Sequence, residues 1–213
     1  MNPIRTYRDF QQFMSYWNYD GKPIPVMLIK PAVLLHLQRE YNIGEILDYY
    51  NHRTGNSIVF FLPGYSHYPV SSFNEVFSPY TRNPDADYAF SYRDYHTNQV
   101  HRVYYNEKDF VDFLSIIESQ TERFWYYGDT ELLFATFVPD SCGGLGELDF
   151  KSLQHHRYNL TELYLNGLST DNHTFALRRI ERFLEMVRHE LERDQTPDEF
   201  YNKVDRLYLN TAH

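Results

Sequence analysis

A run of five apolar residues, Ile58 to Leu62, constrains the fold of this chain more than any other segment. The run contains no polar residue at alternate positions, which is typical of a strand buried on both of its faces. Such a strand lies inside a sheet that helices cover. We therefore expect an α/β protein.

Local patterns around this run predict helices and further strands. Apolar residues recur at helical spacing in Thr6–Trp17 and after Pro31, and capping residues start helices at Asn106 and Thr196. Strand-like segments occur at 25–29, 86–94, 100–105, 123–127 and 130–138, with hairpin turns at HTNQ and at Gly128-Asp129. Hairpins beside helix-linked strands predict a mixed, partly antiparallel sheet with flanking helices.

Nothing in the sequence separates two domains. No Gly/Ser-rich linker, internal repeat or low-complexity tract interrupts the 213 residues. We predict a single α/β domain, 1–213, that ends in two helices over about 170–210. The longer helix, 170–194, has an apolar stripe that includes Ile180, Leu184 and Val187. This stripe is either a core contact or the seam of a homo-oligomer.

Charge and composition narrow the classes of function. The chain has 29 acidic and 20 basic residues and a formal net charge of -9, which argues against general nucleic-acid binding and against anionic membranes. One Cys fits a reducing compartment, and no apolar stretch approaches the roughly 20 residues that span a bilayer. We therefore expect a cytoplasmic protein that does not bind membranes.

The residue types in excess favour recognition. Aromatic residues make up 18% of the chain, and Arg supplies 15 of the 20 basic residues. Tyr brings apolar area and a hydroxyl group to interfaces, and the guanidinium group grips a carboxylate or phosphate through two hydrogen bonds. This composition predicts a partner that is either an anionic small molecule or another protein.

The loop expected after Leu62 is the first candidate site. Gly64–Tyr68 begins like the Gly-x-Ser-x-Gly nucleophile elbow, but Tyr68 stands where that motif needs its second Gly. Pro69 disfavours an immediate helix. Ligands of open α/β sheets bind at the carboxyl ends of strands, so the loop is also a candidate ligand site. Its candidate residues are Ser66 and His67 for catalysis and Tyr65, His67 and Tyr68 for ligand binding.

The glycine-rich loop Ser141–Gly146 is the second candidate site. Successive backbone N–H groups in such a loop cradle anions, although the Lys and hydroxyl residues of a Walker A loop are missing. Cys142 is a candidate nucleophile that needs a base, and His155 and His156 are candidates for that base. The candidate ligand-binding residues are Gly143, Gly144 and Gly146.

A basic stripe lies opposite the apolar stripe of helix 170–194. It consists of Arg178, Arg182, His189 and Arg193. The stripe is either a contact for an anion or acidic partner, or a solvated face paired with neighbouring Glu residues. We take Arg178, Arg182 and His189 as candidate ligand-binding residues.

Metal ligands are present in the sequence without a recognisable motif. His96 and His101 flank the HTNQ turn and Asp94 is close by, but a zinc site needs three or four converging ligands. His189-Glu190 begins an HExxH motif that Arg193 interrupts. From the sequence alone we therefore expect no metal and no cofactor.

The function expected from these signals is binding or regulation inside the cell, by recognition of an anionic small ligand or a protein partner. Every catalytic motif considered departs from its required pattern. Two alternatives stay open. One is a hydrolase or transferase with an active-site Cys, Ser or His, and the other is a structural subunit that forms a homo-oligomer through helix 170–194.

Overall fold

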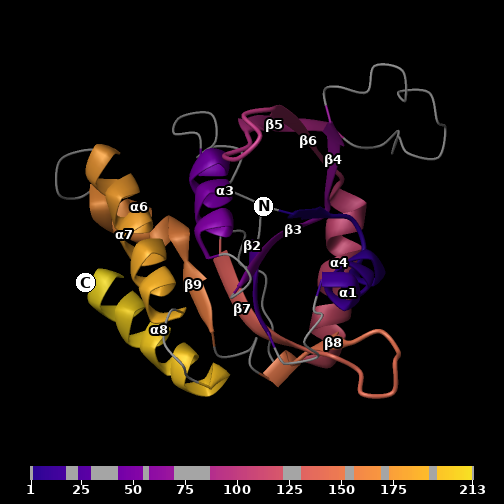
Figure 1. Cartoon of the computed structure of the whole chain (residues 1–213). Helices are drawn as coiled ribbons and strands as arrows, with labels where there is room; N and C mark the ends of the chain where they lie inside the picture. The colour runs from indigo at the N-terminus through magenta and orange to yellow at the C-terminus, as the bar shows by residue number, and fades with distance from the viewer. Residues whose placement is uncertain are drawn as a thin grey trace.

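A computed structural model of the chain describes residues 2–17, 24–29, 43–54, 58–69, 87–121, 131–151, 156–168, 173–191 and 196–212. In these ranges a mixed sheet lies between two layers of helices, and a small antiparallel sheet lies at one end (Figure 1). The α/β class and the mixed sheet predicted from the sequence are confirmed.

The larger sheet has the strand order β1-β3-β2-β7-β8, and β9 also pairs with β7. Its strands are β1 (Asn2–Ile4), β2 (Ile24–Ile29), β3 (Val59–Pro63), β7 (Glu131–Val138), β8 (Glu147–Leu148) and β9 (Arg157–Asn159). β3 is parallel to both β1 and β2, whereas β7 is antiparallel to β2, β8 and β9. The apolar run Ile58–Leu62 therefore supplies an inner strand of the sheet.

Side chains alternate across this sheet and enter two separate apolar clusters. In β3, Phe60 and Leu62 belong to one cluster, and Val59 and Phe61 belong to the other. None of the four is more than 3% exposed. Burial on both faces explains why every position of the strand is apolar.

The helices α1 (Tyr7–Trp17) and α4 (Glu107–Gln120) cover one face of the sheet (Figure 1). Phe10 of α1 and Phe113 of α4 meet edge to face there, with ring centres 6.3 Å apart. The predicted start of α4 is confirmed, because the side chain of Asn106 accepts a hydrogen bond of 2.8 Å from the backbone N–H of Asp109.

The helices α3 (Ile43–Arg53), α6 (Leu160–Leu168), α7 (His173–Leu191) and α8 (Pro197–Ala212) lie on the other face. The capping box of α8 is confirmed: Thr196 N–H donates to Glu199 Oε2 at 2.9 Å, and Glu199 N–H donates to Thr196 Oγ1 at 3.3 Å. The apolar stripe of α7 is buried in the core of this chain through Ile180, Leu184 and Val187. No helix in the described ranges is long and apolar enough to cross a bilayer.

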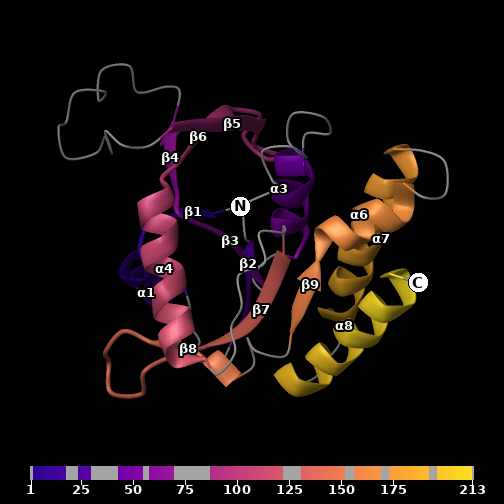
Figure 2. The same cartoon turned by 180° about the vertical axis from the view of Figure 1, so that it is seen from behind.

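The smaller sheet has the order β4-β6-β5, with β4 (Tyr65–Pro69), β5 (Asp87–Arg93) and β6 (Val100–Tyr105) all antiparallel. It lies next to α3 in both views of the molecule (Figures 1 and 2). The hairpin predicted around HTNQ is confirmed as β5 and β6.

The prediction of a loop directly after Pro63 is wrong for residues 65–69, which form β4. Gly64, with φ of 80°, turns the chain out of the larger sheet. Its N–H donates to Ile4 O at 2.8 Å, and its carbonyl accepts from Asn106 N–H at 2.9 Å. β4 then pairs with β6, whose residues lie far along the chain, so no local pattern marks the strand.

Other segments of the sequence form helices or lie outside the described residues. Tyr49 and Tyr50 belong to helix α3, and residues 160–168 form helix α6. The strand expected at 123–127, residues 70–85 of the loop expected after Leu62 and the helix start at Pro31 fall outside the described residues.

Candidate metal centre

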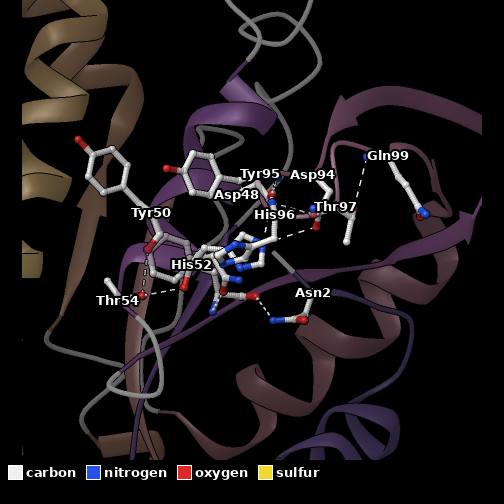
Figure 3. A network of polar contacts seen from close by, with 12 residues as sticks. Asn2, Asp48, Tyr50, His52, Thr54, Asp94, Tyr95, His96, Thr97 and Gln99 are labelled. Atoms are coloured by element: carbon white, nitrogen blue, oxygen red, sulfur yellow. Dashed lines mark hydrogen bonds and ion pairs between the residues drawn. The ribbon is translucent and has the colours of Figure 1, made fainter.

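The C-terminal half of α3 meets the turn between β5 and β6 (Figure 3). Asp48 and His52 are four residues apart, so the helix places them on one face. His52 Nε2 lies 3.5 Å from Asp48 Oδ2 and 3.5 Å from Asp94 Oδ2, at the end of β5. One ligand atom from each residue lies within 4.8 Å of the other two. We call these three residues the Asp48–His52–Asp94 cluster.

Contacts with the larger sheet hold α3 in place. Asn51 Oδ1 accepts a hydrogen bond of 3.0 Å from Phe60 N–H of β3. At the end of the helix, Thr54 Oγ1 donates to the carbonyl of Ile58, next to β3, at 3.3 Å. Leu47, which is 0% exposed, packs in the core. These contacts fix the orientation in which α3 presents Asp48 and His52.

The carboxylate of Asp94 organises the turn that faces α3. Its Oδ1 accepts hydrogen bonds from His96 N–H at 3.0 Å, from Thr97 N–H at 2.6 Å and from Thr97 Oγ1 at 2.7 Å. Asn98 closes the turn with a left-handed φ of 57°. The second oxygen, Oδ2, faces His52, so one side chain both shapes the turn and belongs to the cluster.

The cluster concentrates negative charge in a largely buried place. The side chains of Asp48, Asp94 and His52 are 1%, 16% and 25% exposed. Burial by itself raises the pKa of Asp94, but hydrogen bonds from Thr97 and His96 and the charge of His52 lower that pKa to about 2. Burial, together with the charges of Asp48 and Asp94, raises the pKa of the neighbouring Tyr92 phenol. An ionised, largely buried carboxylate such as that of Asp94 favours a bound cation.

The spacing within the cluster fits ligands of one ion. His52 Nε2 is buried and makes no hydrogen bond within the described part of the chain. A charged His–carboxylate hydrogen bond is about 2.7–2.9 Å long, shorter than the 3.5 Å found here. Donor atoms around a tetrahedral ion with bonds of about 2.0–2.2 Å lie about 3.3–3.6 Å apart. His52 Nε2 is thus at the separation expected between two ligands of one ion from each of the two carboxylate oxygens.

The donor set indicates which ions fit. An imidazole with two carboxylates suits divalent transition metals such as Zn²⁺ and also Mn²⁺. Three protein ligands leave one position of a tetrahedral ion for water or another ligand. Chemically, the cluster is suited to hold a divalent cation and to offer that cation to an anion.

The first loop candidate from the sequence has become a strand. Ser66 lies inside β4 opposite Tyr104, not at the strand-to-helix turn that a nucleophile elbow needs. Its Oγ is buried and makes no hydrogen bond to any described residue. Tyr65 is 1% exposed and packs in the core. His67 and Tyr68 also belong to β4, and their side chains lie outside the described part.

The glycine-rich loop connects β7 to β8 and already surrounds a carboxylate of the chain itself. Asp140 accepts hydrogen bonds from Cys142 N–H at 2.8 Å and Gly144 N–H at 3.0 Å. An incoming anion would have to displace this carboxylate. Gly143 has open space around it, whereas a Cβ on Gly146 would lie 2.5 Å from Phe137 Cζ, so Gly146 serves close packing. Cys142 is exposed, and His155 lies outside the described residues.

The basic stripe of α7 is exposed at Arg178, Arg182 and His189, as the helical spacing predicts. On this helix Glu185 Oε1 accepts from Arg188 at 2.6 Å and lies 3.6 Å from His189 Nε2. Arg193 falls outside the described residues. Anion binding by this stripe stays a prediction.

Local sequence patterns do not reveal two of the three cluster residues, Asp48 and His52. The pair Asp48-x3-His52 has the four-residue spacing of helical metal ligands, which is the signal that was available. Asp94 was recognised as a neighbour of His96, but only the fold brings α3 to that turn. The sequence predicts no metal, whereas the cluster indicates a metal site that can be tested.

Scans against protein-family models and searches of curated proteins and of solved structures return no match to this chain. The geometry of the cluster is therefore the main indication of function.

Proposed function

We propose that this chain is a metal-binding protein that holds a divalent transition-metal ion, such as Zn²⁺, between Asp48, His52 and Asp94. The observation that supports the proposal is the buried Nε2 of His52, which makes no hydrogen bond in the described part and lies 3.5 Å from a carboxylate oxygen on each side. A metal ion bonded to all three residues would satisfy the imidazole nitrogen and neutralise the carboxylates together.

The sequence predicts recognition of an anionic small ligand, and a bound ion would provide the place where that ligand binds. The ion offsets the negative charge of Asp48 and Asp94, which would otherwise repel an anion. The position left open by the three protein ligands then accepts an anionic oxygen. The proposal thus keeps a binding function and assigns it to the α3–turn junction rather than to the glycine-rich loop.

The first test compares zinc affinities of ligand variants. Protein stripped with EDTA is titrated with Zn²⁺ in competition with a chromophoric chelator. Asp48→Asn, His52→Gln and Asp94→Asn should each weaken zinc binding by about 100-fold or more, because each removes a direct ligand. Zinc should also raise the melting temperature of the wild-type protein and leave that of His52→Gln nearly unchanged.

Asp112→Asn is the matched control. Like Asp48, Asp112 is a helical carboxylate with its partner four residues away, since Lys108 Nζ lies 2.6 Å from Asp112 Oδ2, but its side chain is 61% exposed. This variant should bind zinc as the wild type does. Equal zinc affinity in His52→Gln and wild type, or no zinc binding by the wild type, would show that the cluster is not a metal site.

The enzyme and oligomer alternatives have weaker support among the described residues. Ser66 lies within a strand, and the exposed Cys142 lies in a turn whose N–H groups bind Asp140. The apolar stripe of α7 is buried within the chain, so a second copy would have to use another surface. Neither alternative has an observation comparable to the position of His52.

A further inference from the structure

His96 lies beside the Asp48–His52–Asp94 cluster without being one of its three residues. It follows Asp94 by two residues in the β5–β6 turn, and its side chain is exposed. The ring centre of His96 is 4.4 Å from that of His52, and the two rings meet at an interplanar angle of 80° (Figure 3). A second imidazole is therefore within reach of an ion bound to His52.

The distance between the two rings suits a shared ion. Two imidazoles on one tetrahedral ion, with bonds of about 2.0–2.1 Å, have ring centres about 5 Å apart. His96 is not among the residues whose ligand atoms group within 4.8 Å, so its ring has to reorient to ligate. Because the side chain is exposed, this rotation does not disturb the core.

The turn keeps the backbone of His96 in place while the ring reorients. His96 N–H donates to Asp94 Oδ1 at 3.0 Å, and Asp94 Oδ2 faces the cluster. Thr97 binds the same Oδ1 through its N–H at 2.6 Å and its hydroxyl at 2.7 Å. An ion bound to Asp94 would therefore lie close to the backbone of His96.

We propose that His96 is a fourth, exchangeable ligand that completes a two-His, two-Asp site and increases the preference of the site for Zn²⁺ over Mn²⁺. This inference rests on the proposed function, since it needs an ion at Asp48, His52 and Asp94. A second imidazole favours zinc, whereas a site of mostly oxygen ligands also suits manganese. Because His96 is exposed, an anionic ligand competes with it for the fourth position.

The test measures Zn²⁺ and Mn²⁺ affinities of three His96 variants. His96→Ala removes the ring, His96→Phe keeps a ring against His52 without a nitrogen, and His96→Cys supplies a thiolate ligand. Zinc affinity should fall about tenfold or more in the Ala and Phe variants, and manganese affinity should fall less. The Cys variant should retain tight zinc binding. Zinc-loaded His96→Ala should bind inorganic phosphate more tightly than the zinc-loaded wild type.

Two results would overturn the inference while the proposed function stands. One is wild-type zinc affinity in His96→Ala, with His52→Gln still weakened. The other is wild-type zinc affinity in His96→Phe alone, which would mean that the ring contributes packing rather than a ligand. If His52→Gln also binds zinc normally, both the inference and the proposed function fail. Urea unfolding in EDTA provides the folding control, since His96→Ala should match the wild type in stability.

Discussion

At the scale of single residues, Asp94 both stabilises the turn between β5 and β6 and contributes negative charge to the cluster. Oδ1 accepts the hydrogen bonds of the turn, and Oδ2 faces His52. The turn therefore needs the ionised carboxylate whether or not an ion is bound. Protonating Asp94 weakens both the turn and its attraction to His52, which makes its titration visible in the stability of the fold.

We expect the ionisation of Asp94 to make the free energy of unfolding depend on pH in the acid range. The pKa of Asp94 in the folded chain is about 2, below the ordinary 3.8, so its contribution is complete above about pH 5 and is lost as pH falls towards 2. In EDTA, Asp94→Asn should be about 1–2 kcal/mol less stable than wild type at pH 6. The measurement is urea unfolding of both proteins at several pH values. A stability difference that stays constant down to pH 2 would contradict the expectation.

At the scale of elements, Gly64 is the corner at which the chain leaves one sheet for the other. Its φ of 80° disfavours any other residue, and an added Cβ would lie 2.5 Å from Phe110 Cβ of α4. Gly64→Ala should therefore lower the free energy of unfolding by about 2–4 kcal/mol, from overpacking together with backbone strain. Urea unfolding measures this loss.

The variant Gly143→Ala separates the cost of overpacking from the cost of backbone strain. Gly143 has a similar φ of 82°, but nothing lies within 4 Å of its added Cβ. This control should cost only about 1 kcal/mol, from backbone strain alone. If the two variants lose the same stability, the close approach of Gly64 to α4 contributes nothing.

The elements predicted well are those with local signals. The capping residues Asn106 and Thr196 start α4 and α8 as predicted, and β3 follows from its apolar run. β4 was missed because its pairing with β6 is non-local and Gly64 sets its direction. The candidate metal centre was missed for the same reason. Asp48 and His52 become neighbours of Asp94 only when α3 packs beside β5.

The excess of tyrosine also has an explanation at this scale. Tyr201 of α8 shares a hydrogen bond of 2.9 Å with Thr136 of β7, and Tyr208 donates at 2.8 Å to Glu162 of α6. Burial raises the pKa of both phenols. Composition indicated recognition, but these rings pack between elements and use their hydroxyl groups to connect α8 to the rest of the fold.

At the scale of the whole molecule, one sheet separates two apolar clusters and links them through shared strands. Phe60 and Phe61 are neighbours in β3, are 1% and 0% exposed, and belong to different clusters. A change on either face therefore acts on the same strand. This arrangement predicts that the described body unfolds as one cooperative unit rather than as two domains.

Phe60→Ala and Phe61→Ala test this prediction from the two sides. Each deletes a buried ring and should lower the free energy of unfolding by about 3–5 kcal/mol. Each variant should still show one transition, with far-UV and near-UV circular dichroism changing together, because neither cluster holds its face of the sheet without the other. A Phe60→Ala protein that loses the α6–α8 side first, while α1 and α4 stay folded, would show two independent units and contradict the single domain predicted from the sequence.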